Sequence, residues 1–146
     1  MGATISKNLY DTDFVEWTAR TATLLREGRI DELDIENVAE EIESLGKSDR
    51  GRSRLGLARM LFQLIMQKFE QGSRTAIFEE RIIIANILED SPSLRQHLQD
   101  NLDGIYARAV KEATYVMQLP EPRAAEIPPG CPYTLDDLLE GNLHPL

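Results

Sequence analysis

Five polar residues stand out by their chemistry and by their positions on predicted helices. They are Asp34, Asn37, Glu41, Gln63 and Arg81. On a helical wheel the carboxylate of Glu41 falls at the edge of an apolar arc, where a charged group is partly buried and needs a partner. Arg81 interrupts the apolar stripe of a later helix, and its planar guanidinium suits a two-point contact with a carboxylate. We therefore predict a Glu41–Arg81 pair. The competing carboxylates for this arginine are Asp11, Asp13 and Asp34.

The same residues allow two interpretations. In the first, Glu41 and Arg81 form an architectural ion pair, and Gln63 is a core amide whose hydrogen bonds are satisfied. In the second, the cluster lines the pocket of a small hydrolase or metal-dependent enzyme, and Asp34 and Glu41 supply oxygens to Mg²⁺ or Ca²⁺. We favour the ion pair, and the sequence leaves open whether the protein is an enzyme.

Complete catalytic and cofactor motifs are absent from the sequence. Di-metal helical bundles use repeated Glu-x-x-His pairs, and the chain has only two histidines, His97 and His144, far apart. Cys131 lies in a proline-rich turn without a histidine near it in sequence, so it does not match a nucleophile–base pattern. There is also no phosphate-binding loop and no Gly-x-Gly-x-x-Gly. We expect neither a cofactor nor a metal site.

The charge balance argues against nucleic acid as a partner. The 146 residues include 16 basic and 25 acidic ones, a formal net charge of -9, and duplex binding depends on neutralising phosphates. One basic run could still be a patch for RNA or for an acidic protein. Its members are Lys47, Arg50, Arg52, Arg54 and Arg59. We expect these side chains instead to pair within the molecule, and the acidic candidates are Glu40, Glu43 and Asp49.

Apolar residues recur with helical spacing along most of the chain, and strand signals are almost absent. The fold class predicted is therefore all-α, a single helical bundle of about five main helices. The expected helices run from Asp11 or Asp13 to Gly28, from Asp31 or Asp34 to Gly46, and over about 48–71, 74–90 and 91–119. Residues 1–10 form an N-terminal arm and 11–119 the bundle.

Residues 120–146 are predicted to form an extended, proline-rich tail wrapped over the bundle. Proline fixes φ and removes a donor, so "PEPRAAEIPPGCPY" is not expected to be helical. A short terminal helix follows, where Thr134 and Asp137 have the spacing of a capping box. Four apolar residues of this tail need cover, which is the reason to expect wrapping. They are Ile127, Tyr133, Leu135 and Leu138.

Three features indicate the cytoplasm. Cys131 is the only cysteine, so no disulfide can form within the chain. The N-terminal stretch "MGATISKNLYDTDF" lacks the apolar core of a signal peptide. The longest apolar run, "IIIANIL", is much shorter than the roughly 20 residues that a membrane-spanning helix needs.

Several segments together resemble a known family. They are "YDTDFVEWTARTATLLREGRIDELDIENVAEEIESLGKSDR", "ERIIIANILEDSPSL" and "CPYTLDDLLEG" with a final "HPL". From Tyr10 to Pro145 the chain is similar to the bacterial family described as domain of unknown function 29. The resemblance implies an all-helical domain and no particular activity. The residues that fall on typical family positions are Trp17, Leu25, Arg26, Asp34, Asn37, Glu40, Glu41, Glu43, Arg81, Pro92, Cys131 and Pro132.

The chain departs from the family pattern in its middle. Many members have His-Leu-Leu-Lys-Trp where this chain has Gln63 followed by Leu-Ile-Met-Gln, and a later Ser-Trp is missing near Gly72. This departure argues against histidine-based catalysis here. We therefore expect a non-enzymatic helical module that acts through contacts with a protein partner, in the form of a small homo-oligomer.

Overall fold

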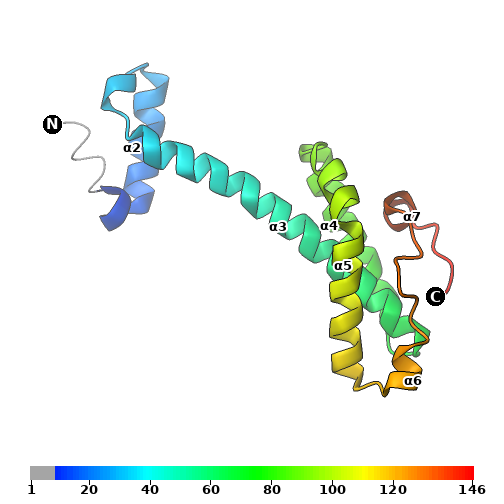
Figure 1. The fold of residues 1–146 in the computed structure, drawn as a ribbon. Coiled ribbons are helices and arrows are strands. Elements are labelled where there is room, and N and C mark those ends of the chain that lie inside the picture. The colour runs from blue at the N-terminus through cyan, green and yellow to red at the C-terminus, as the bar shows by residue number, and fades with distance from the viewer. Residues whose placement is uncertain (1–8) are drawn as a thin grey trace. The chain divides into compact units, whose positions relative to one another are not determined.

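A computed structural model describes residues 9–146, and in this part of the chain all regular secondary structure is helical. The helices are α2 (Phe14–Arg26), η1 (Ile30–Glu32), α3 (Ile35–Lys68), α4 (Arg74–Asp90), α5 (Leu94–Met117), α6 (Glu121–Ala124) and α7 (Leu135–Glu140), preceded by a helical turn over 9–12 (Figure 1). The predicted all-α class is confirmed. Most of the predicted N-terminal arm, residues 1–8, lies outside the described residues. No helix of the described part is long and apolar enough to cross a bilayer.

The contacts between residues group the chain into two compact units. The first unit ends at Ser48 and the second begins at Asp49. The boundary falls inside α3, which is helical on both sides of it. Each unit has its own packing, and the two are described separately below.

The predicted break between two helices at Gly46 is wrong, because α3 runs without interruption from Ile35 to Lys68 (Figure 1). A glycine costs a helix only about 1 kcal/mol, and no proline follows to enforce a stop. Pairs one turn apart add support, with 4.0 Å between Lys47 Nζ and Glu43 Oε2 and 3.6 Å between Arg52 Nη1 and Asp49 Oδ1. The basic run therefore lies within a helix and partly pairs with the predicted acidic neighbours.

The first unit packs α2 and η1 against the beginning of α3, with few apolar contacts. Asp13 caps α2 by accepting a hydrogen bond from the Glu16 amide at 3.0 Å. The buried apolar side chains of the unit's described part are Trp17, Leu24 and Leu33. The rings of Tyr10, Phe14 and Trp17 lie 4.9–5.9 Å apart between centroids and form an aromatic cluster.

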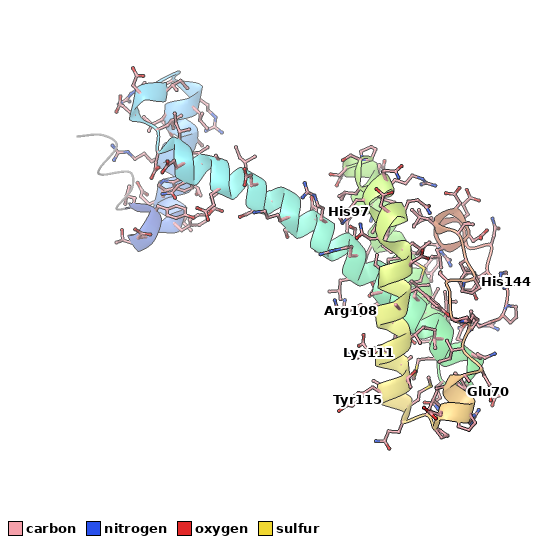
Figure 2. All side chains as sticks on the ribbon, in the orientation of Figure 1. Glu70, His97, Arg108, Lys111, Tyr115 and His144 are labelled. Atoms are coloured by element: carbon pink, nitrogen blue, oxygen red, sulfur yellow. The ribbon has the colours of Figure 1, made fainter. Side chains whose placement is uncertain are left out.

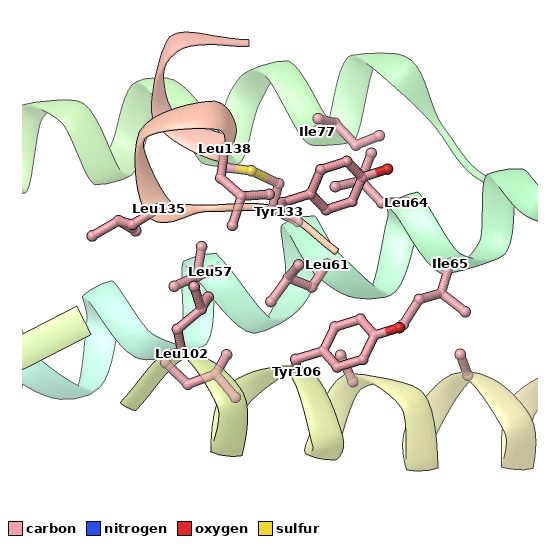
Figure 3. Close-up of a cluster of buried hydrophobic side chains, with 14 of the residues drawn as sticks. Leu57, Leu61, Leu64, Ile65, Ile77, Leu102, Tyr106, Tyr133, Leu135 and Leu138 are labelled. Carbon is pink, nitrogen blue, oxygen red and sulfur yellow. The ribbon is translucent and has the colours of Figure 1, made fainter. Parts of the chain in front are cut away.

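The second unit holds the main hydrophobic core. The second half of α3 packs between α4 and α5, and residues of the C-terminal segment fill the remaining side (Figure 3). In Figure 3 the side chains of Leu135 and Leu138 lie over Leu57 and Leu61 of α3. Gly56 is buried where α3 meets α4, and a Cβ there would lie 3.1 Å from Ile84 Cγ1. The absent side chain allows the two helices to approach closely.

The predicted tail covers this core, with one correction. All four apolar residues expected to need cover are buried, at 0–5 % exposure. Glu121–Ala124 is helical rather than extended, because proline is tolerated in a first turn where its amide would have no partner. α7 begins with the expected capping box, in which Thr134 and Asp137 exchange hydrogen bonds at 2.9 and 3.1 Å. Arg95 of α5 pairs with Asp136 and ties α7 to the bundle.

Candidate functional site

Glu41 has a partner inside the first unit. The Tyr10 hydroxyl donates a hydrogen bond of 2.6 Å to Glu41 Oε1, and both side chains are half-buried. This hydrogen bond is the main cause that raises the pKa of Tyr10 to about 12, because ionising the phenol would place two negative charges together. Glu41 thus joins the helical turn at 9–12 to α3.

Asp34 and Asn37 meet at the start of α3. Asp34 is 3 % exposed, and its Oδ2 accepts a 2.7 Å hydrogen bond from Asn37 Nδ2. The Asn37 amide lies 3.5 Å from Asp34 Oδ1, so the aspartate also approaches the position of a helix cap. Trp17 is buried in the same unit, and no acceptor in the described part of the chain bonds its Nε1. Three of the five candidate residues therefore stabilise the entry into α3.

Arg81 belongs to the second unit and bonds to backbone rather than to a carboxylate. Its Nε donates a 2.8 Å hydrogen bond to the carbonyl of Leu138, near the C-terminal end of α7. Helix carbonyls at that end carry partial negative charge and accept from cations. Gly141 ends α7 with φ of +82°, and a Cβ on it would lie 3.1 Å from Arg81 Nη1. The guanidinium lies against a position that glycine keeps free.

A pocket of about 890 Å³ surrounds this arginine. Leu64, Ile77 and Tyr133 contribute buried apolar side chains to its lining. The charged lining residues are Lys68 at the end of α3, Glu70 in the following connection, and Arg74 and Arg81 on α4. His144, after α7, also lines it, and its ring lies against the Tyr133 ring at a tilt of 37°, with ring centroids 4.9 Å apart (Figure 2 labels Glu70 and His144). The pocket is thus cationic in a protein whose net charge is -9.

Gln63 has a local structural contact. Its Oε1 accepts a 2.9 Å hydrogen bond from the Ser73 amide, which joins the last turns of α3 to the start of α4. Gln63 lines a different, smaller pocket with Arg108, whereas Arg81 lines the large one. The five candidates are therefore divided: Asp34, Asn37 and Glu41 lie in the first unit, and Gln63 and Arg81 in the second. The Glu41–Arg81 pair stays a prediction.

Within residues 9–146 no group of three or more histidine, cysteine, aspartate and glutamate side chains is arranged to hold a metal ion. His97 lies on α5 and His144 in the segment after α7 (Figure 2). The Cys131 thiol is half-buried and donates to the Tyr133 carbonyl at 3.4 Å, and burial raises its pKa. A raised pKa disfavours the thiolate that a nucleophile needs.

A row of apolar side chains on the predicted apolar arc of α3 is exposed. Ile35, Ile42 and Leu45 are 60 %, 64 % and 70 % exposed. Together with the half-buried Val38 they occupy positions a and d of two successive heptads, the spacing of a helix that packs along another helix. α2 contributes three further exposed apolar side chains, Phe14, Val15 and Leu25.

Sequence reasoning missed two kinds of residue. Tyr10 was placed in the arm, and nothing in the sequence linked it to a carboxylate 31 positions later. The cationic pocket was missed as well, although one signal was available. Arg74 and Arg81 are seven residues apart, which places them on one face of a helix. The heptad spacing of the apolar row was also visible in the sequence.

Comparison with known proteins gives one match. Residues 9–143 match the family model described as "Domain of unknown function DUF29". No curated protein and no solved structure matches the chain.

Proposed function

The chain belongs to the DUF29 family, and we propose that its first unit is a non-enzymatic interaction module whose partner is a second copy of the same chain. The observation that carries the proposal is the apolar surface left open in this unit. Among its described residues three large apolar side chains are buried, whereas seven are exposed. The seven are Phe14, Val15, Leu25, Ile30, Ile35, Ile42 and Leu45.

A unit this small needs further apolar burial to be stable. The unit ends at Ser48, and domains of fewer than about 60 residues bury a small fraction of their surface and are marginally stable on their own. The first unit has no cysteine, since the only one is Cys131. Exposed apolar patches of soluble proteins commonly mark interfaces. Association through α3 would bury Ile42 and Leu45 and stabilise the unit at the same time.

A second copy in antiparallel orientation matches the whole apolar row. When Ile42 of one copy lies opposite Val38 of the other, Ile35 lies opposite Leu45, so the a and d positions of both rows face each other, twice by symmetry. Gly46 and Ala39, at the edge of the row, leave room for close approach of the helices.

Sedimentation equilibrium tests the proposal. The wild-type protein is expected to sediment at about twice the monomer mass of 16.5 kDa. Ile42→Glu places a charge in the proposed interface and is expected to give a monomer, because an unpaired charge is costly to bury. Ile83→Glu is the matched control, since Ile83 is 43 % exposed on α4 and does not belong to the row, and this variant is expected to stay dimeric.

A wild-type protein that sediments as a monomer at all concentrations excludes the second copy as partner. The broader proposal of an interaction module is then tested by affinity capture with wild-type and Ile42→Glu baits. It fails if every captured protein is retained by both baits. We also propose a bacterial cytoplasmic location, which the single, reduced Cys131 supports.

A further inference from the structure

We propose that the pocket of the second unit binds a small organic anion, with a carboxylate or phosphate group on an apolar body. The pocket has a volume of about 890 Å³, within the range of small-molecule sites. It is independent of the α3 surface proposed above for self-association, because its lining begins at Leu64.

The first argument is the arrangement of two arginines. Arg74 and Arg81 lie on the same face of α4, two turns and about 10 Å apart along the axis, with Ile77 and Phe78 between them. Arg81 is held in place by its Nε bond to Leu138, which leaves its two Nη groups without a hydrogen bond in the described part of the chain. Guanidinium groups of this kind bind carboxylates and phosphates through two parallel N–H donors.

The second argument is the charge that is left unpaired. No hydrogen bond or ion pair within residues 9–146 engages Arg74. Lys68 donates to the Leu146 carbonyl at 3.1 Å, so it is partly engaged by backbone. Among the described lining residues Glu70 is the only one with a carboxylate side chain, and it is exposed rather than bonded to either arginine. An anion entering the pocket would therefore meet Arg74 and the Nη groups of Arg81, donors that no carboxylate side chain of the described residues occupies.

The third argument is the apolar lining, which selects for an organic body rather than for a bare ion. Tyr133 is 4 % exposed, its hydroxyl donates to the His144 carbonyl at 2.6 Å, and its ring lies against the His144 imidazole in a tilted arrangement. Ile77 and Leu64 are buried and line the same pocket. Apolar walls with a few convergent polar groups are typical of small-molecule sites.

Isothermal titration calorimetry at low salt tests the proposal with four probes. Phenyl phosphate and phenylacetate carry an anion on an apolar ring, benzyl alcohol carries the ring without charge, and inorganic phosphate carries charge without the ring. We expect the two ring anions to bind, and the alcohol and phosphate to bind at least tenfold more weakly. A difference between the two ring anions then tells a phosphate site from a carboxylate site.

Two variants locate the binding. Arg74 is exposed, so Arg74→Gln is expected to keep the fold. The variant is expected to weaken binding of the two ring anions about tenfold or more, because it removes a charge-assisted hydrogen bond. Arg108→Gln is the matched control, because Arg108 is exposed on α5 on the opposite side from His144 (Figure 2) and should leave binding unchanged. The proposal is overturned if no ring anion binds at about 10 mM, which corresponds to roughly -3 kcal/mol. The proposal is also overturned if benzyl alcohol binds as tightly as the ring anions do, or if Arg74→Gln and Arg108→Gln weaken binding of the ring anions equally.

Discussion

Replacing Gly141 by alanine tests how the C-terminal segment is held on the second unit. Gly141 has φ of +82°, where an L-residue is strained by about 1–2 kcal/mol. The new Cβ would also lie 3.1 Å from Arg81 Nη1 and displace the guanidinium that bonds Leu138. Weakening that hydrogen bond adds about 0.5–1 kcal/mol to the loss of stability. We expect Gly141→Ala to lower the free energy of unfolding by about 1.5–3 kcal/mol.

Gly104→Ala is the matched control for this prediction. Gly104 lies within α5 with no atom within 4 Å of its would-be Cβ, so alanine should stabilise the helix by about 0.5–1 kcal/mol. Urea unfolding followed by far-ultraviolet circular dichroism measures both changes. With a slope of about 2 kcal/mol per molar urea, the Gly141 variant should lose about 1 M in its midpoint. The reasoning is refuted if the two variants shift the midpoint in the same direction.

Three further predictions concern other parts of the chain. Leu138→Ala should lower the free energy of unfolding in urea by about 2–5 kcal/mol, because this side chain of α7 is fully buried against the core, and a loss under about 1 kcal/mol would contradict the packing. Tyr10→Phe should destabilise the protein at pH 8. The difference in free energy of unfolding between the variant and the wild type should disappear as pH rises through about 12, because the Tyr10 pKa is raised above its unfolded value near 10. A difference that grows with pH would contradict the Tyr10–Glu41 hydrogen bond. Cys131 should react with a thiol reagent at pH 8 more slowly than the free thiol of glutathione does, because burial raises the pKa of Cys131. An equal reaction rate would contradict the burial of this thiol.

Local sequence signals predicted much of the fold. α4 begins at Arg74 and ends at Asp90, as the spacing of its apolar residues indicated, and its cap is Ser73. The capping box of α7 was also predicted, because it depends on residues three positions apart in sequence. The burial of the tail was predicted because its large apolar side chains are unfavourable in water. The continuation of α3 across Gly46 was not predicted, because a single glycine ends some helices and is tolerated within others.

The candidate site was harder to predict because its partners come from distant positions. A helical wheel showed correctly that Arg81 interrupts an apolar face, but it could not show that a backbone carbonyl 57 residues later would accept from it. Glu41 was likewise singled out for its position, and its partner Tyr10 lies in a segment without a strong pattern. The apolar row of α3 was recognised as an arc, yet a wheel shows only which side chains share a face, not what covers them.

The distance between two spin labels tests the proposed pairing of α3 most directly. In a Cys131→Ser background, a label at Glu36→Cys lies at an exposed position of the helix. In the antiparallel pair Glu36 is offset from its symmetry mate by about 8 residues, or about 12 Å along the axis, and both labels face away from an interface between helices roughly 10 Å apart, so an electron–electron distance of about 25 Å is expected. The absence of any dipolar coupling would mean that α3 does not pair with a second copy.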